Sequence, residues 1–191
     1  MQDDPLLLKK KLRAHFLDAR KNLSSTAVIE KSNQIIEKLV NLSLFKSSRV
    51  IHCYVSMNIR KEVHTHEFIN QSIQKEKKIL VPKMKSGGRL SHSAISSLDE
   101  LEINEWGVPE PVTENYPDSS GIDLVIVPMV SGDRKLNRLG YGMGYYDRFL
   151  KDLSAFKIGL LFDCQLYDKA LPVEEFDIPL DMLITESETV A

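Results

Sequence analysis

The sequence is poor in cysteine, in long hydrophobic runs and in net charge, and each shortage excludes a class of protein. Its two cysteines, Cys53 and Cys164, are too few for a disulfide framework, so we expect a reducing compartment such as the cytoplasm. Cys53 lies within an apolar stretch and is predicted to be a buried free thiol. The formal net charge of −2 gives no bulk attraction to nucleic acid, so no nucleic-acid partner is expected.

Apolar runs are too short to place the chain in a membrane. A membrane-spanning helix needs roughly 20 apolar residues, and no stretch approaches that length. The leucines at residues 6–8 run directly into the lysines at residues 9–11, which is too short for the apolar region of a signal peptide. With 191 residues, 42% of them hydrophobic and 27% charged, the chain fits a single globular domain over residues 1–191, which we expect to be monomeric.

Hydrophobic periodicity predicts an alternation of helices and strands. Helices are expected over residues 6–23, from a cap at Ser24 or Ser25 to about Leu39, from a cap at Thr65 to about Ile73, and over residues 145–153. Strands are expected over residues 49–55, 78–82, 123–128, 156–162 and 182–185. Because a strand–helix–strand unit implies a parallel sheet, the predicted fold is α/β: a single-domain, three-layer α/β/α architecture with a mostly parallel, Rossmann-like sheet.

Two of the predicted strands end in a proline. Proline cannot donate to the ladder of a central strand, so Pro82 and Pro128 are expected to mark strand ends. Open α/β sheets bind ligands beyond the carboxyl ends of their strands. The loops after Val55, Pro82 and Pro128 are therefore the expected place for a site. The stretch from Lys85 to Asp123 is irregular, and its organisation beyond a small antiparallel excursion is not defined by the sequence.

The most informative stretch is residues 138–148, RLGYGMGYYDR, in which Gly140, Gly142 and Gly144 alternate. Glycine lets backbone N–H groups approach a ligand where a Cβ would block it. The start of the helix that follows then offers unpaired N–H groups to an anion. The stretch therefore predicts a phosphate-binding loop, as in a nucleotide enzyme.

Residues beside these glycines distinguish a functional loop from a flexible one. The spacing does not match the dinucleotide fingerprint, and no Gly-Lys-Ser/Thr follows as in a Walker loop. The alternative is a surface loop whose glycines only form turns. Arg138, Arg148 and two tyrosines favour a functional loop, and Asp147 lies where a metal-bound phosphate would need a carboxylate.

Together with motifs elsewhere in the chain, this loop resembles the 5-formyltetrahydrofolate cyclo-ligase family, also called 5,10-methenyltetrahydrofolate synthetases. The resemblance covers nearly the whole chain, and the glycine–tyrosine–aspartate block is its most specific part. The segments that carry it are Lys9-x-x-Leu12-Arg13, Glu62-Val-His-Thr65, Ile79-Leu-Val-Pro82, Trp106-Gly-Val-Pro-Glu-Pro111, Asp123-Leu-Val-Ile-Val-Pro128, residues 138–147, Leu171-Pro172 and Asp177-Ile-Pro-Leu-Asp181.

The resemblance implies an enzyme that uses ATP and Mg²⁺ to convert 5-formyltetrahydrofolate into 5,10-methenyltetrahydrofolate. The formyl group on N5 is an amide, and its oxygen is a poor leaving group. Phosphorylation of that oxygen by the γ-phosphoryl group of ATP activates the formyl carbon, N10 attacks it, and phosphate leaves. The reaction needs two ligands held in line and stabilisation of charge on the phosphoryl group.

The resemblance also implies which residues hold ATP and the metal. Lys9 and Arg13, four residues apart on one helix, would contact the ATP phosphates; by themselves the two residues favour an ordinary charged face. Asp147 would bind Mg²⁺, the alternative being a carboxylate that stabilises the start of a helix. The implied nucleotide loop consists of Arg138, Leu139, Gly140, Tyr141, Gly142, Met143, Gly144, Tyr145 and Tyr146. Of these, Arg138 would stabilise charge on the γ-phosphoryl group.

A further set of residues would hold the folate. Glu62 would accept hydrogen bonds from the pterin edge, and Trp106, the single tryptophan, would stack on a flat ring. Residues 141–145 would also contact the substrate, with Tyr145 near the reacting formyl group. The alternatives are a solvated loop carboxylate for Glu62 and a core or lid aromatic for Trp106.

Departures from the usual family pattern keep other functions open. They occur at Ser131, Leu136, Met143 and Phe176, and the sequence does not define their effect on rate. One alternative is a non-catalytic relative that binds folate or nucleotide. Another is a sugar-phosphate or acyl-CoA enzyme on a similar scaffold, because a fold does not determine a function.

Overall fold

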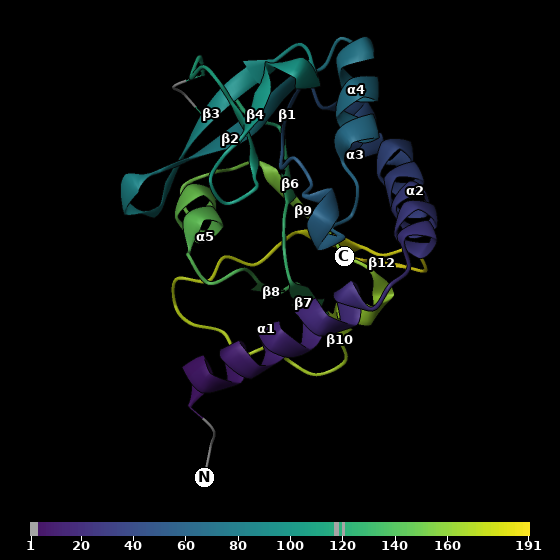
Figure 1. Cartoon of the computed structure of the whole chain (residues 1–191), viewed down its shortest axis with the longest axis vertical. Coiled ribbons are helices and arrows are strands. Elements are labelled where there is room, and N and C mark those ends of the chain that lie inside the picture. The colour runs from purple at the N-terminus through teal and green to yellow at the C-terminus, as the bar shows by residue number, and fades with distance from the viewer. Residues whose placement is uncertain (1–3, 117–118, 120) are drawn as a thin grey trace.

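A seven-stranded sheet forms the centre of the computed structural model, which describes residues 4–116, 119 and 121–191 (Figure 1). Its strands are β1 (Val50–Cys53), β2 (Lys78–Lys85), β3 (Arg89–Ile95), β6 (Leu124–Val127), β9 (Phe156–Leu160), β11 (Met182–Ile184) and β12 (Thr189–Val190). The strand order is β12-β11-β9-β6-β1-β2-β3. The five inner strands are parallel, whereas β3 and β12 at the edges are antiparallel to their neighbours. The mostly parallel sheet is confirmed.

Helices cover both faces of this sheet, which gives the predicted three layers. The helices are α1 (Pro5–Lys21), α2 (Ser25–Asn41), α3 (Ser43–Ser47), α4 (His66–Gln74) and α5 (Tyr145–Leu150). Ile35 of α2, Phe45 of α3 and Phe68 of α4 pack into one buried cluster with the inner strands. Leu150 of α5 packs on the opposite face, in a cluster with Val125. Within the described part of the chain, no helix is long and apolar enough to cross a membrane.

Helix starts follow the predicted caps in position, but one cap works differently. The Ser24 hydroxyl accepts a hydrogen bond from the backbone N–H of Ala27 at 3.1 Å and so caps α2. Thr65 precedes α4 without capping it. Its hydroxyl instead donates to the carbonyl of Tyr54 and accepts from the N–H of Ser56, both at 2.9 Å. Thr65 therefore ties the end of β1 to the start of α4.

The prediction that Pro82 ends a strand is wrong, because β2 continues through it to Lys85. Beyond Leu80, β2 pairs with β3 and no longer with β1, so a residue without an N–H is tolerated there. Pro128 does follow the end of β6. The extension of β2 makes a long hairpin with β3, through the 3₁₀ turn η2 (Ser86–Gly88).

The described part of residues 85–123, the segment that the sequence did not define, contains mainly antiparallel structure. After β3, η3 (Leu98–Glu100) leads into a second hairpin of β4 (Leu101–Ile103) and β5 (Pro109–Pro111). The expected small antiparallel excursion is confirmed. A further 3₁₀ turn, η1 (Asn58–Arg60), follows β1.

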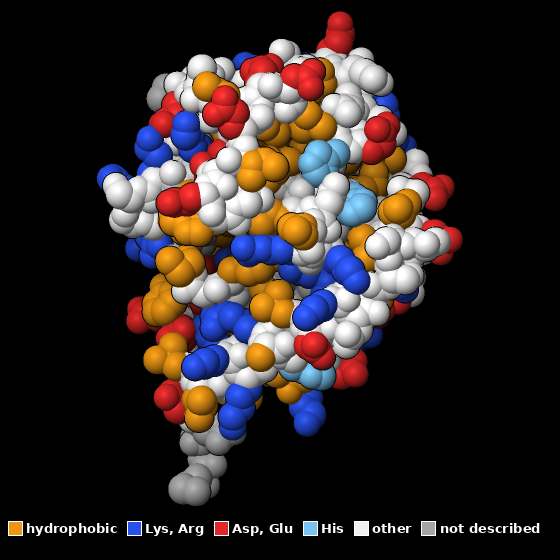
Figure 2. Space-filling view, viewed as in Figure 1, with side chains coloured by type: hydrophobic (Ala, Val, Ile, Leu, Met, Phe, Trp, Pro, Cys, Tyr) orange, Lys and Arg blue, Asp and Glu red, His pale blue; other side chains and the backbone are white. Residues whose placement is uncertain are grey.

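A second small sheet, absent from the prediction, lies at the carboxyl end of the central strands. It consists of β10 (Leu166–Tyr167), β7 (Ser131–Asp133) and β8 (Arg138–Leu139), with η4 (Asp163–Gln165) beside it. Leu12 and Phe16 of α1 pack with Val130, Leu139 and Leu171 at this sheet. The helix therefore crosses below the main sheet (Figure 1), and Lys and Arg side chains gather on this face over α1 (Figure 2).

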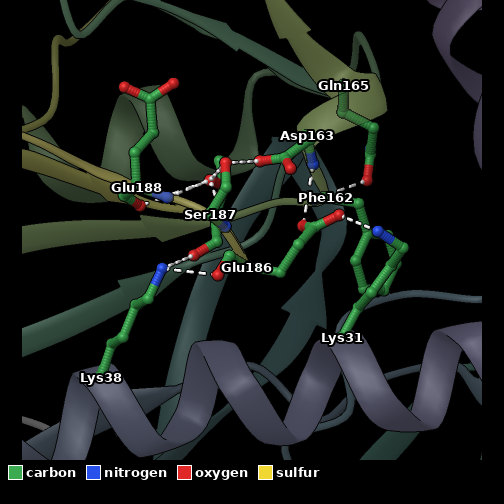
Figure 3. Close-up of polar contacts among 9 residues, drawn as sticks. Lys31, Lys38, Phe162, Asp163, Gln165, Glu186, Ser187 and Glu188 are labelled. Atoms are coloured by element: carbon green, nitrogen blue, oxygen red, sulfur yellow. Dashed lines mark hydrogen bonds and ion pairs between the residues drawn. The ribbon is translucent and has the colours of Figure 1, made fainter.

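The turn between β11 and β12 is held against α2 by two lysines (Figure 3). Lys31 forms an ion pair with Glu186, and Glu186 also accepts a hydrogen bond from the backbone N–H of Asp163 at 2.9 Å. Lys38 donates to the carbonyls of Thr185 and Glu186 at 3.0 and 2.6 Å. These bonds fasten the C-terminal edge of the sheet to its helical layer.

Replacing Glu186 by alanine should lower the free energy of unfolding by about 1–3 kcal/mol, because it leaves the Asp163 N–H and Lys31 without their partner. Urea unfolding followed by circular dichroism measures the change. Glu30→Ala, an exposed glutamate on α2, is the matched control and should change stability little. Equal stability of Glu186→Ala and wild type would contradict this role.

Two histidines are buried between the sheet and α5. The rings of His52 and His92 lie 5.0 Å apart, and each is within 4.7 Å of the Phe149 ring. Among the described residues, neither nitrogen of His52 nor Nδ1 of His92 has a hydrogen-bond partner. Burial lowers the pKa of His52 well below its ordinary value and lowers the pKa of His92 to about 4. Both rings therefore pack as neutral groups.

The fold should lose stability as the pH falls from 6.5 towards 4, because in this range the two histidines bind protons in the unfolded chain but stay neutral in the folded protein. Each pKa unit of the difference is worth about 1.4 kcal/mol. The variant His52→Leu should show a shallower loss, measured as the free energy of urea unfolding across that pH range. An identical pH dependence in variant and wild type would show that His52 does not contribute.

Candidate active site

A cavity of about 530 Å³ lies where the loops after β1 and β6 meet the second half of β2 and helix α1. β1 stands between β2 and β6, so the strand order changes direction here, the usual ligand position in an open α/β sheet. The volume is typical of a small-molecule site. Most of the predicted site residues line it: Lys9, Glu62, Trp106, Arg138, Gly140, Tyr141, Gly142, Met143, Gly144, Tyr145, Tyr146 and Asp147. Arg13 and Leu139 lie outside the lining.

Each glycine of the glycine loop, residues 140–144, lies directly against an arginine. A Cβ on each would approach a guanidinium group to 2.6, 3.3 and 2.9 Å, in chain order. The pairs are Gly140 with Arg138, Gly142 with Arg13, and Gly144 with Arg148. The absence of side chains at these positions therefore lets three positive charges converge on one short loop.

Two of these arginines also hold the backbone of the loop. Arg13 donates from Nε to the carbonyl of Gly140 at 2.8 Å. Arg148 donates to the carbonyl of Met143 at 2.6 Å and to that of Gly88 at 2.7 Å, which joins the loop to the β2–β3 hairpin. The sequence marked Arg148 as a flanking charge without giving it a role. The sequence indicated that Arg148 contacts the loop only through its position, four residues after Gly144.

Arg138 and Asp147 form an ion pair at the floor of the cavity. Arg138 Nη2 lies 2.6 Å from Asp147 Oδ1, and the two side chains are 5% and 18% exposed. No group of three or more His, Cys, Asp or Glu that could hold a metal occurs among the residues described. Mg²⁺ often takes one or two protein carboxylates and completes its shell with phosphate oxygens and water. A single carboxylate such as Asp147 fits that pattern, and the role of Asp147 as a metal ligand stays a prediction.

Lys9 is buried and already has partners. Its Nζ lies 2.6 Å from Glu174 Oε2 and 2.5 Å from Asp177 Oδ2, and 5.9 Å from the centre of the Phe176 ring. A phosphate contact by Lys9 would therefore involve sharing or exchanging these carboxylates. That predicted contact remains untested.

Glu62 is held in the lining of the cavity by two hydrogen bonds. It is 4% exposed, and its Oε2 accepts a hydrogen bond from the backbone N–H of Met57 at 2.8 Å. Its Oε1 accepts a hydrogen bond from the hydroxyl of Tyr141. The interpretation of Glu62 as a solvated loop carboxylate is wrong, because the loop after β1 turns it inward.

Aromatic residues of the cavity have contrasting environments. Trp106 is 58% exposed at the rim, so it is not a core residue. The Tyr146 hydroxyl is buried and has no hydrogen-bond partner among the described residues. Burial raises the pKa of both Tyr141 and Tyr146, so both phenols stay protonated. Tyr145 lines the cavity as predicted.

Several lining residues were not predicted as site residues. They come from several segments of the chain and include Tyr54, Met57, Arg60, Met84, Leu90, Glu110 and Phe176. Phe176 was noted as a departure from a family pattern, whereas nothing in the sequence pointed to Met84 or Leu90. They reach the cavity because β2 continues past Pro82 into the long hairpin with β3.

Comparisons with known proteins agree with the geometry. Residues 7–186 match the 5-formyltetrahydrofolate cyclo-ligase family. A relative in Schizosaccharomyces pombe, a probable 5-formyltetrahydrofolate cyclo-ligase, is 28% identical over 96% of this chain and 98% of its own. The Escherichia coli K12 5-formyltetrahydrofolate cyclo-ligase is 35% identical over 70% of this chain and 77% of its own.

A solved structure gives the same result. The 5,10-methenyltetrahydrofolate synthetase of Aquifex aeolicus superposes with a TM-score of 0.84 at 33% identity, covering 95% of this chain and 91% of its own. The family match spans most of the chain, and the fold agrees throughout. The protein belongs to the 5-formyltetrahydrofolate cyclo-ligase family and is an enzyme.

Proposed function

We propose that this protein converts 5-formyltetrahydrofolate into 5,10-methenyltetrahydrofolate with ATP and Mg²⁺. The observation that carries the proposal is one cavity lined by two chemically different groups of residues. The first, called the phosphate end, is the glycine loop with its three arginines, and the second, called the folate end, consists of the buried carboxylate of Glu62 and the exposed Trp106. The family match and the names of the relatives support the same reaction.

The glycine loop is the end suited to the phosphates of ATP. The guanidinium groups of Arg13, Arg138 and Arg148 place positive charge around a stretch of backbone in which every second residue lacks a Cβ atom. Arginine binds phosphate oxygens through two parallel hydrogen bonds, which orients the group as well as attracting it. Asp147 beside Arg138 would hold Mg²⁺, which neutralises charge on the phosphates when bound.

The other end suits the folate. Glu62 has one oxygen bonded to Met57 and the other to Tyr141, so its carboxylate is held in one orientation with acceptor capacity left for the pterin N–H groups. Trp106 at the rim offers a flat face to an aromatic ring of the substrate. With the pterin held in this way, the formyl group would be directed towards the glycine loop.

In the proposed reaction, the formyl oxygen on N5 attacks the γ-phosphorus of ATP, and the bond between the γ-phosphorus and the bridging oxygen breaks to release ADP. N10 then adds to the activated formyl carbon, and the C–O bond breaks to release phosphate. N10 loses its proton as the ring closes. Arg138 would stabilise negative charge on the transferring phosphoryl group, and Tyr145, which also lines the cavity, would lie near the reacting formyl group. The remaining contribution is holding the two ligands in line.

The direct test is spectroscopic. Purified protein mixed with 5-formyltetrahydrofolate, Mg²⁺ and ATP should develop the methenyl absorbance, with one ADP formed per product. A control without ATP should develop none. Binding of 5-formyltetrahydrofolate without ADP release would contradict the proposal and favour a non-catalytic folate binder.

Replacing Asp147 by asparagine should reduce turnover by about 100-fold or more, because the charge that binds Mg²⁺ is lost while the side-chain shape remains. Turnover measured against Mg²⁺ concentration would separate weaker metal binding from a slower chemical step. Asp152→Asn, an exposed aspartate beyond the end of α5, is the control. Equal turnover in Asp147→Asn and wild type would exclude Asp147 as a metal ligand.

The monomeric state and the cytoplasmic location expected from the sequence remain predictions. One relative is named as a mitochondrial enzyme in Arabidopsis thaliana, so family membership does not decide location.

A further inference from the structure

Arg20 is a buried charge without an acidic partner. It lies in the last turn of α1 and is 2% exposed. Its Nη2 donates to the Tyr141 hydroxyl at 2.9 Å, and its guanidinium carbon lies 5.8 Å from the centre of the Tyr141 ring. Among the described residues Arg20 forms no ion pair, and its Nε has no hydrogen-bond partner. Burying a guanidinium group costs free energy, and the hydrogen bond to Tyr141 is the contact that offsets this cost.

The Tyr141 hydroxyl joins Arg20 to Glu62. A phenol has one proton to donate and lone pairs to accept with. Arg20 has only donors, so the tyrosine oxygen accepts from Arg20 and must direct its own proton to Glu62 Oε1. The chain of donors therefore runs in one direction, from Arg20 through Tyr141 to Glu62.

Arg20 acts from behind the cavity rather than inside it. Tyr141 and Glu62 line the 530 Å³ cavity, whereas Arg20 is absent from that lining. It borders a separate small cavity of about 10 Å³, which Glu62 and Tyr54 also line. A ligand in the large cavity would thus meet Glu62 and Tyr141 but not the guanidinium group. Any effect of Arg20 on substrate must pass through these two side chains.

The geometry points to Arg20 as a positioning residue for folate, which orients the Tyr141 hydroxyl and thereby the Glu62 carboxylate that receives the pterin. The inference rests on the proposed function, since it needs 5-formyltetrahydrofolate in this cavity. Helix α1 would then support both ends of the site. Its Arg13 supports the phosphate end of the site through Gly140, and its Arg20 supports the folate end through Tyr141.

The inference predicts a selective loss of folate affinity. Arg20→Met and Tyr141→Phe should each raise the KM for 5-formyltetrahydrofolate about tenfold, with the KM for ATP changed less than about twofold. A tenfold change matches the loss of one charge-assisted hydrogen bond. Arg20→Lys, which keeps a donor, should recover part of the affinity. Lys21→Met removes the same charge from the exposed neighbour of Arg20 and should leave both constants unchanged.

A double-mutant cycle distinguishes relay through Tyr141 from a general structural role. The variant Arg20→Met with Tyr141→Phe should raise the KM for folate no more than Tyr141→Phe alone, since either change breaks the same chain. Strictly additive effects, or equal increases in the KM values for folate and ATP, would overturn the inference. If Arg20→Met does not fold, as judged by its thermal melt, Tyr141→Phe and Arg20→Lys decide the matter by the same criterion.

Binding measured without turnover separates this inference from the proposed function. The fluorescence of Trp106, the single tryptophan, reports 5-formyltetrahydrofolate in the cavity that it lines. If wild type neither binds this folate nor turns it over, the proposed function fails. If wild type binds and the Arg20 variants bind equally well, the proposed function survives and Arg20 has no positioning role.

Discussion

The contact between α1 and the glycine loop is the interaction on which the rest of the site depends. Apolar packing of Leu12 and Phe16 on the small β10-β7-β8 sheet places the helix across the carboxyl ends of the central strands. Arg13 and Arg20 then reach the loop, the first at the Gly140 carbonyl and the second at the Tyr141 hydroxyl. Without this docking the cavity would lose one wall and the loop two of its supports.

Charge is buried at both ends of the cavity, and the sign of that charge is the reason for assigning the phosphates of ATP to one end and the folate to the other. At the phosphate end, arginines outnumber the carboxylate of Asp147, which leaves an excess of positive charge for an anion. At the folate end, the Glu62 carboxylate is held by hydrogen-bond donors and retains capacity for the N–H groups of a pterin. One helix, α1, supplies a positive group to each end, Arg13 at Gly140 and Arg20 at Tyr141, so a single rigid element supports both parts of the proposed site.

Much of the fold and part of the site could be predicted from the sequence. Apolar runs rich in β-branched residues located the inner strands, which are buried on both faces of the sheet, and helical periodicity located the longer helices, which bury one face. The glycine loop, Glu62 and Trp106 were recognised from local motifs and do line one cavity. The continuation of β2 past Pro82 was missed. A strand can contain a proline where one neighbouring strand has ended, and the sequence does not show that β1 stops pairing with β2 at Leu80. The small sheet of β7, β8 and β10 was missed because its strands are too short for a pattern.

The sequence by itself determined which residue types stand together: glycines at alternate positions, arginines on both sides of them, and a carboxylate at the start of the next helix. These are local properties of neighbouring residues. Only the tertiary structure decided that Arg13 and Arg20 face the loop, that Glu62 is buried against Tyr141, and that Lys9 is held by Glu174 and Asp177. Those pairings join residues far apart in the chain. The ones made by α1 form because the helix buries its apolar face on the small sheet of β7, β8 and β10, and Glu62 meets Tyr141 because the loop after β1 lies against the glycine loop.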